Sequence, residues 1–124
     1  MSKISFLSDA FEVYHIIMAV KGVYPDNFTL SQLLRGLKIL WQSQLINLQN
    51  QQQLYSAQNF LHAIGKQLNI MVYRYAKNID EIILNSYMDL CVKFQMPDDA
   101  IQMYEMVQDV SIRADGAEFY DELQ

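Results

Sequence analysis

Two nine-residue stretches ninety positions apart repeat one helical pattern, and this repetition constrains the fold more than any other feature of the chain. They read DAFEVYHII, residues 9–17, and DAIQMYEMV, residues 99–107. The match continues past the next turn at three positions, 89 residues apart: Asp26 with Asp115, Leu30 with Phe119 and Leu34 with Leu123. Self-similarity of this kind is typical of stacked helical hairpins, each too thin to bury its apolar face without a neighbour.

The composition predicts one folded domain, residues 1–124. Hydrophobic residues make up 52% of the 124 and charged residues 19%, which is typical of a globular protein. Four glycines and two prolines leave few tight turns, so helices are favoured over a many-stranded sheet. Cys91 is the only cysteine, so no internal disulfide can form. No apolar run approaches the roughly 18 residues of a membrane span, and no direct membrane insertion is expected.

Apolar residues at helical spacing predict an all-α fold of stacked antiparallel hairpins. The predicted helices cover about residues 6–20, 28–46, 54–68, 81–94 and 99–110, and another begins near 118. Asp26 or Asn27 is expected to cap the second of these helices, and Asp98, after the turn at Pro97, is a candidate cap for the fifth. A glutamine-rich insertion is expected near 42–56, and its stretch QSQLINLQNQQQ, residues 42–53, is interpreted as a frayed helix end and a solvated connector. Residues 69–80 are interpreted as a link that can include a short helical turn.

Residues 81–115, EIILNSYMDLCVKFQMPDDAIQMYEMVQDVSIRAD, resemble one 35-residue unit of the pentatricopeptide repeat family. Residues 9–34 look like the second helix of such a unit, a G-x-x-P-D turn and the opening of the next, and GKQL at 65–68 is similar to a segment of plant-type members. The tryptophan, glycine and proline pattern of tetratricopeptide repeats is absent. The resemblance implies an α-solenoid, and another kind of α-hairpin solenoid is the alternative.

The family resemblance also implies binding of single-stranded RNA in an organelle. It marks Asn85 and Asp115 as a base-reading pair similar to the one that favours uracil, with Ile82 packed on the base. Ser31 and Asp26 are further candidates in the first hairpin. In the alternative interpretation, Asn85 is a solvated polar residue and Asp115 a helix cap.

The overall charge opposes a protein whose whole surface attracts RNA. The formal charge is −5 and the sequence pI is about 4.8, so any nucleic-acid contact must be local. Arg74 and Lys77, near the rings of Tyr73 and Tyr75, could form a small basic patch capable of stacking. They could equally belong to an ordinary solvated loop.

Catalysis finds little support in the sequence, and no enzyme activity, cofactor or metal is expected. Cys91 lies on the apolar stripe of its helix and is interpreted as a small buried thiol. His15 and His62 have no partner at metal-ligand spacing, and the chain has no phosphate-binding glycine loop.

These observations predict a non-catalytic binding module, a small subunit of an organellar ribonucleoprotein such as the mitochondrial ribosome. Its expected partners are protein subunits and, locally, single-stranded RNA. A sequence-specific RNA-binding factor in organellar RNA processing and a structural subunit of a mitochondrial membrane complex are the alternatives. The first and last units look like half-units, so a protein partner or self-association is expected to cover their apolar surface. The N-terminus resembles neither a secretory signal nor a typical transit peptide, so the mitochondrial location is an inference from the family alone.

Overall fold

The described part of the chain is helical, in agreement with the predicted all-α class. The computed structural model describes Val13, residues 26–74 and residues 80–109. Three helices are α2 (Asn27–Gln42), α3 (Gln51–Arg74) and α4 (Glu81–Lys93), and residues 97–109 form a further helical segment. No strand occurs among these residues. The predicted helix at 6–20 and the repeated stretch 9–17 lie outside the described residues, apart from Val13. The helix predicted to start near 118 and the repeat partners beyond residue 109 also lie outside them.

Helix α2 begins at the cap that the sequence predicted. The Asp26 carboxylate accepts a hydrogen bond from the backbone N–H of Thr29 at 2.8 Å, and this bond lowers the pKa of the carboxyl. Leu30, Leu34 and Leu37 form the buried stripe. The helix ends at Gln42, four residues before the predicted end.

The prediction of a connector through residue 53 was wrong in its last three residues, because α3 begins at Gln51. Asn47 and Asn50 organise the short turn: the Asn47 side chain accepts from the N–H groups of Gln49 and Asn50, and the Asn50 side chain accepts from Gln53. Asn50 therefore stands where a capping residue is needed. The turn is also anchored by Ile46, which is buried in the core.

Helix α3 is longer at both ends than the predicted helix at 54–68. Residues 69–74, predicted as a link, continue it, because Leu68 and Val72 extend the buried stripe by a further turn. The mixture of β-branched residues and helix formers in this segment gave no clear propensity, and burial of the stripe decides the conformation.

The turn after α4 differs slightly from the prediction. Phe94 caps α4, with its N–H bonded to the carbonyl of Leu90. The next helical segment begins at Pro97, two residues before the predicted start, since proline needs no N–H partner in a first turn. Asp98 is accordingly inside that segment and is not its cap. Val110, its predicted last residue, lies outside the described part.

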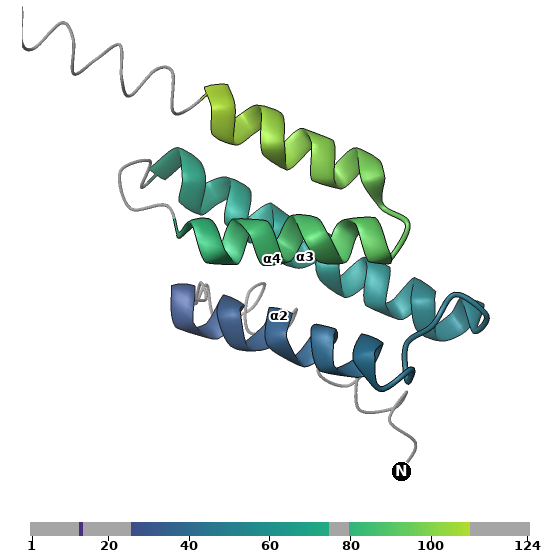
Figure 1. Ribbon diagram of the computed structural model, residues 1–124. Coiled ribbons are helices and arrows are strands. Elements are labelled where there is room, and N and C mark those ends of the chain that lie inside the picture. The colour runs from purple at the N-terminus through teal and green to yellow at the C-terminus, as the bar shows by residue number, and fades with distance from the viewer. Residues whose placement is uncertain (1–12, 14–25, 75–79, 110–124) are drawn as a thin grey trace, which may run out of the picture.

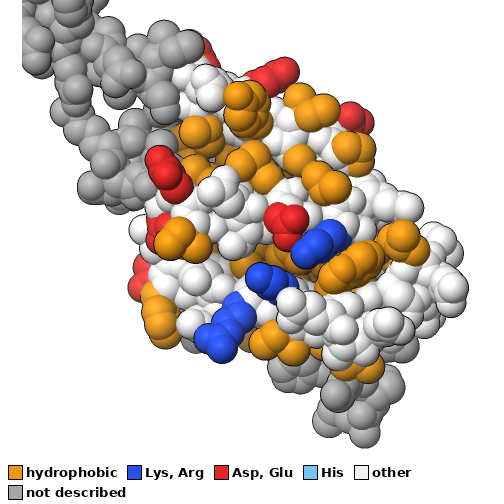
Figure 2. Space-filling view, in the orientation of Figure 1, with side chains coloured by type: hydrophobic (Ala, Val, Ile, Leu, Met, Phe, Trp, Pro, Cys, Tyr) orange, Lys and Arg blue, Asp and Glu red, His pale blue; other side chains and the backbone are white. Residues whose placement is uncertain are grey.

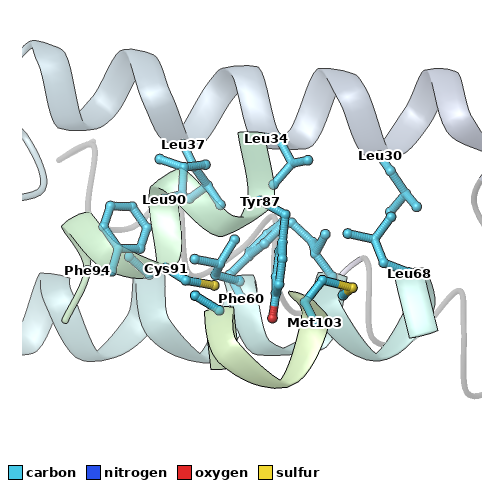
Figure 3. Packing of buried hydrophobic residues seen from close by; sticks show 14 of the residues in the cluster. Leu30, Leu34, Leu37, Phe60, Leu68, Tyr87, Leu90, Cys91, Phe94 and Met103 are labelled. Atoms are coloured by element: carbon cyan, nitrogen blue, oxygen red, sulfur yellow. The ribbon is translucent and has the colours of Figure 1, made fainter. Parts of the chain in front are cut away.

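The helices form two consecutive hairpins, α2 with α3 and α4 with residues 97–109. Helices α2 and α4 lie side by side and run in the same direction, while α3 and residues 97–109 return the opposite way (Figure 1). All four contribute to one hydrophobic cluster. Figure 3 shows Leu34 and Leu37 of α2 pointing toward Tyr87 and Leu90 of α4.

A constant register relates α2 to α4. Leu34 and Tyr87, and Leu37 and Leu90, are each 53 positions apart in the sequence. The same separation holds for Trp41 and Phe94. Their ring centroids lie 5.6 Å apart at an interplanar angle of 51°. The two helices therefore pack in parallel, and positions that are 53 apart in the sequence face each other at these three places.

Candidate binding groove between α2 and α4

An open groove follows the seam between α2 and α4, on the face shown in Figure 2. Its volume is about 420 Å³. Its described lining residues come only from these two helices: Ser31, Leu34, Arg35, Lys38, Ile39, Gln42, Ile82, Ile83, Ser86, Asp89 and Leu90. We call this feature the α2–α4 groove.

The floor and the rim of the groove differ in chemistry. Leu34, Ile83 and Leu90 are buried and belong to the core, so they form an apolar floor. Two aliphatic side chains of the lining are exposed, Ile39 at 52% and Ile82 at 77%. Covering such an isoleucine with a partner is favourable by roughly 25 cal/mol for each Å² of apolar surface buried.

The charged residues give the groove a positive balance. Arg35 and Lys38 are exposed and form no ion pair within the described part of the chain. The one acidic lining residue, Asp89, is bound by Lys93 at 2.9 Å, one helical turn away. The Lys93 charge offsets that of Asp89, which leaves two lining cations without an ion-pair partner among the described residues of a chain whose net charge is −5.

The groove continues toward the C-terminal ends of the two helices. A second depression is lined by Trp41, Gln42, Gln44, Ile46, Asn47 and Lys93. Gln42 lines both depressions. A partner longer than the α2–α4 groove could therefore extend over amide side chains and the edge of Trp41.

Two of the RNA-binding candidates from the sequence lie in the groove. Ser31 and Ile82 line it, one from each helix. Asn85 is exposed on α4 but is not a lining residue. Asp26 is exposed and caps α2 through its carboxylate.

The remaining candidates fall on side chains that the structure does not describe. Arg74 is the last residue of α3, and its side chain is not described. Lys77 and Asp115 lie outside the described residues, so the predicted Asn85–Asp115 pair and the predicted basic patch stay predictions.

Sequence reasoning missed the cations Arg35 and Lys38, although a signal for them exists. Ser31, Arg35, Lys38 and Gln42 follow the spacing i, i+4, i+7 and i+11. This is a polar stripe on one face of α2, beside the leucine stripe that faces the core. Its functional meaning depends on α4 lying next to it, which the periodicity of α2 does not reveal.

Outside the groove, the side chains of Tyr87 and Cys91 on α4 are buried and form a hydrogen bond with each other. The Tyr87 side chain is only 3% exposed, and Cys91 is fully buried, as the sequence predicted. Burial raises the pKa of the Cys91 thiol to about 12, and it also raises the pKa of Tyr87. A thiol that stays protonated near neutral pH is a poor nucleophile.

His62 lies at the surface and has an acidic neighbour that the sequence spacing did not reveal. Its Nδ1 atom is 3.1 Å from an Asp99 carboxylate oxygen, so this contact joins α3 to the start of the helical segment 97–109. Gln58 connects α3 with the end of α4, because its side chain donates a hydrogen bond to the carbonyl of the α4 C-cap, Phe94, at 2.8 Å. His15 lies outside the described residues. The described residues contain no group of three or more histidine, cysteine or acidic side chains that could hold a metal ion.

The described helices and the comparisons with known proteins add two findings. Among the described residues, none of the helices combines the length and apolar character that crossing a bilayer requires. No protein-family model, curated protein or solved structure matches the chain. The resemblance to pentatricopeptide repeats therefore stays a prediction from the residues that carry it.

Proposed function

We propose that the protein is a non-catalytic binding module of the pentatricopeptide-like helical-repeat kind. It acts as a small subunit of an organellar, mitochondrial ribonucleoprotein or a comparable large complex, in which it contacts protein and, locally, single-stranded RNA. The observation that carries the proposal is the parallel packing of α2 and α4 at a constant register of 53 positions, with an open groove along the seam.

The packing supports a repeat because stacked hairpins place equivalent helices side by side. A separation of 53 is one 35-residue unit and 18 further residues. The turn at 43–50 and the long helix α3, 24 residues, accommodate such an excess. Repeat arrays present extended surfaces of this kind to elongated partners.

Single-stranded RNA binding as the main activity is the second candidate. It is favoured by Ser31 and Ile82, two residues selected by family resemblance, which line the same groove as the cations Arg35 and Lys38. Cations along a groove attract the phosphate backbone, and the resulting affinity falls as the salt concentration rises.

Affinity purification of the tagged full chain from its own cells, with identification of bound proteins and RNA, tests the proposal. We expect a defined set of subunits of one large organellar complex to be recovered at physiological salt. Recovery of the chain alone, as a free monomer outside organelles, would rule the proposal out.

A fluorescent twelve-nucleotide uridine strand tests the second candidate on the purified chain. If RNA binding is the main activity, the strand binds with strong salt dependence, and both Asn85→Ala and Ile82→Ala weaken it. Tyr55→Ala, on the exposed face of α3, is the matched control and should leave binding unchanged.

A further inference from the structure

We propose that the α2–α4 groove binds an acidic polypeptide segment with aliphatic anchor residues, contributed by a partner protein. The inference rests on the proposed function and specifies the partner of that same site. It is carried by charge complementarity and by the exposed isoleucines at the groove.

The charge of the groove selects for acidic groups. Arg35 and Lys38 lie one turn apart on α2, both exposed and both without an ion-pair partner among the described residues. Lys93 is already engaged with Asp89. A segment with carboxylates at matching spacing would supply partners to both free cations, and the guanidinium of Arg35 can accept a carboxylate in two parallel hydrogen bonds.

The apolar residues select for a polypeptide over a nucleic acid. Bases bind single-strand sites mainly by stacking on aromatic faces. No aromatic side chain is among the described residues that line the α2–α4 groove. Its exposed apolar residues are Ile39 on α2 and Ile82 on α4, which suit leucine, isoleucine or valine side chains of a partner.

The length of the groove sets the size of the segment. From Ser31 to Gln42 the axis of α2 advances roughly 16 Å, at about 1.5 Å per residue. An extended peptide covers this distance in about five residues and a helical peptide in about eleven. A short linear segment is therefore long enough to reach both free cations and both exposed isoleucines.

A peptide selection on the full chain tests the proposal. Random 16-residue peptides displayed on phage are selected on the wild-type chain and on the double variant Arg35→Glu, Lys38→Glu. The control is Lys66→Glu, which reverses the charge of an exposed lysine on α3, outside the groove. Circular dichroism and thermal melting confirm that each variant is folded.

We expect the wild-type chain and the Lys66→Glu control to enrich peptides that are rich in Asp, Glu and aliphatic residues. A synthetic copy of an enriched peptide should bind the double variant at least roughly tenfold more weakly, since exposed charge pairs each contribute modestly and reversal adds repulsion. Ile82→Asp should weaken the same peptide, because it removes an anchor and adds a negative charge at the rim.

Four results would overturn the proposal. The enriched peptides could show no excess of Asp and Glu, or they could bind the double variant as tightly as they bind the wild-type chain. The uridine strand could bind at the groove while no peptide is enriched, which would favour the RNA form of the proposed function. Finally, it could be found that neither the peptides nor the uridine strand bind, although the chain still co-purifies with a large complex. In that case the proposed function stands and this assignment of the groove fails.

Discussion

Gly65 shows how closely the two hairpins approach each other at the level of single residues. It is buried in α3 against the phenol of Tyr87 in α4. A Cβ atom placed on Gly65 would collide with the Tyr87 hydroxyl oxygen and would lie 2.7 Å from Cζ of the ring. Gly36, exposed on α2, has no atom within 4 Å of such a Cβ. Two helical glycines of one chain therefore have opposite roles.

The substitutions Gly65→Ala and Gly36→Ala should change stability in opposite directions. Alanine favours a helix over glycine by about 1 kcal/mol, so Gly36→Ala should raise the free energy of unfolding by up to that amount. Gly65→Ala should lower it by about 1–3 kcal/mol, because Tyr87 is 3% exposed and has little room to move. Urea unfolding followed by circular dichroism measures both. Adding Tyr87→Phe to Gly65→Ala should recover part of the loss; equal stabilisation by the two alanines would contradict this packing.

The Cys91 thiol gives the stability of the protein a dependence on alkaline pH. Burial raises its pKa from 9.0 to about 12. Because the unfolded thiol ionises first, the stabilising contribution is complete below about pH 9 and is lost as the pH rises toward 12. By pH 10 the thiol should account for about 1 kcal/mol of lost stability.

Urea unfolding of the wild type and of Cys91→Ala at pH 7, 9 and 10 tests this dependence. The variant should be less stable at pH 7, because the substitution leaves a small cavity. Its stability should fall less steeply between pH 9 and 10. Tyr87 has a raised pKa as well and should leave the variant some dependence on pH. An identical slope for both proteins would show that the thiol is not buried in the native state.

At the scale of elements, the alignment of α2 with α4 depends on contacts near the two C-terminal ends. Trp41 is half-buried near the end of α2, and Phe94 is fully buried at the cap of α4. Their tilted contact at 5.6 Å lies within the range preferred by aromatic pairs. This contact holds the C-terminal ends of α2 and α4 together.

A double-mutant cycle with Trp41→Leu and Phe94→Leu should reveal this contact as a coupling energy. We expect about 0.5–1.5 kcal/mol of coupling in the free energy of unfolding. A second cycle with Trp41→Leu and Tyr104→Leu is the control, because Tyr104 is exposed on the segment 97–109. Coupling near zero in the first cycle would indicate that α2 and α4 are not aligned at this register.

At the scale of the whole molecule, the two hairpins share one core and should unfold together. The buried residues of α2, α3, α4 and the segment 97–109 form a single hydrophobic cluster. The His62–Asp99 contact and the Gln58–Phe94 hydrogen bond also connect α3 with the turn and helical start that follow α4. Over residues 26–74 and 80–109, neither hairpin has a separate core, so a change in one should be detected in the other.

Met103→Ala tests this cooperativity, since Met103 is buried in the second hairpin and Trp41 reports on the first. The substitution should cost about 2–5 kcal/mol. The unfolding midpoints by Trp41 fluorescence and by circular dichroism should shift equally. The adjacent change Tyr104→Ala, at an exposed side chain, should cost about 0.5 kcal/mol or less. A fluorescence midpoint that stays in place after Met103→Ala would mean that the hairpins unfold independently.

Local features of the structure were predictable from the sequence with good accuracy. The all-α class, the cap at Asp26 and the buried position of Cys91 follow from periodicity and capping chemistry, which act within a few residues. Helix ends were less accurate. Helix α3 extends from Gln51 to Arg74 because Asn50 caps its first turn and because burial of Val72 outweighs the mixed propensities of residues 69–74.

The sequence by itself determined where the middle of each described helix lies and which stripe of it is apolar, since both depend on neighbours within one or two turns. Only the tertiary structure decided that α2 lies against α4, 53 positions away, and that Arg35 and Lys38 thereby line a groove with Ile82. An apolar stripe requires burial but does not specify its partner. That choice is made when side chains from distant parts of the chain pack into one core, and the groove exists because of it.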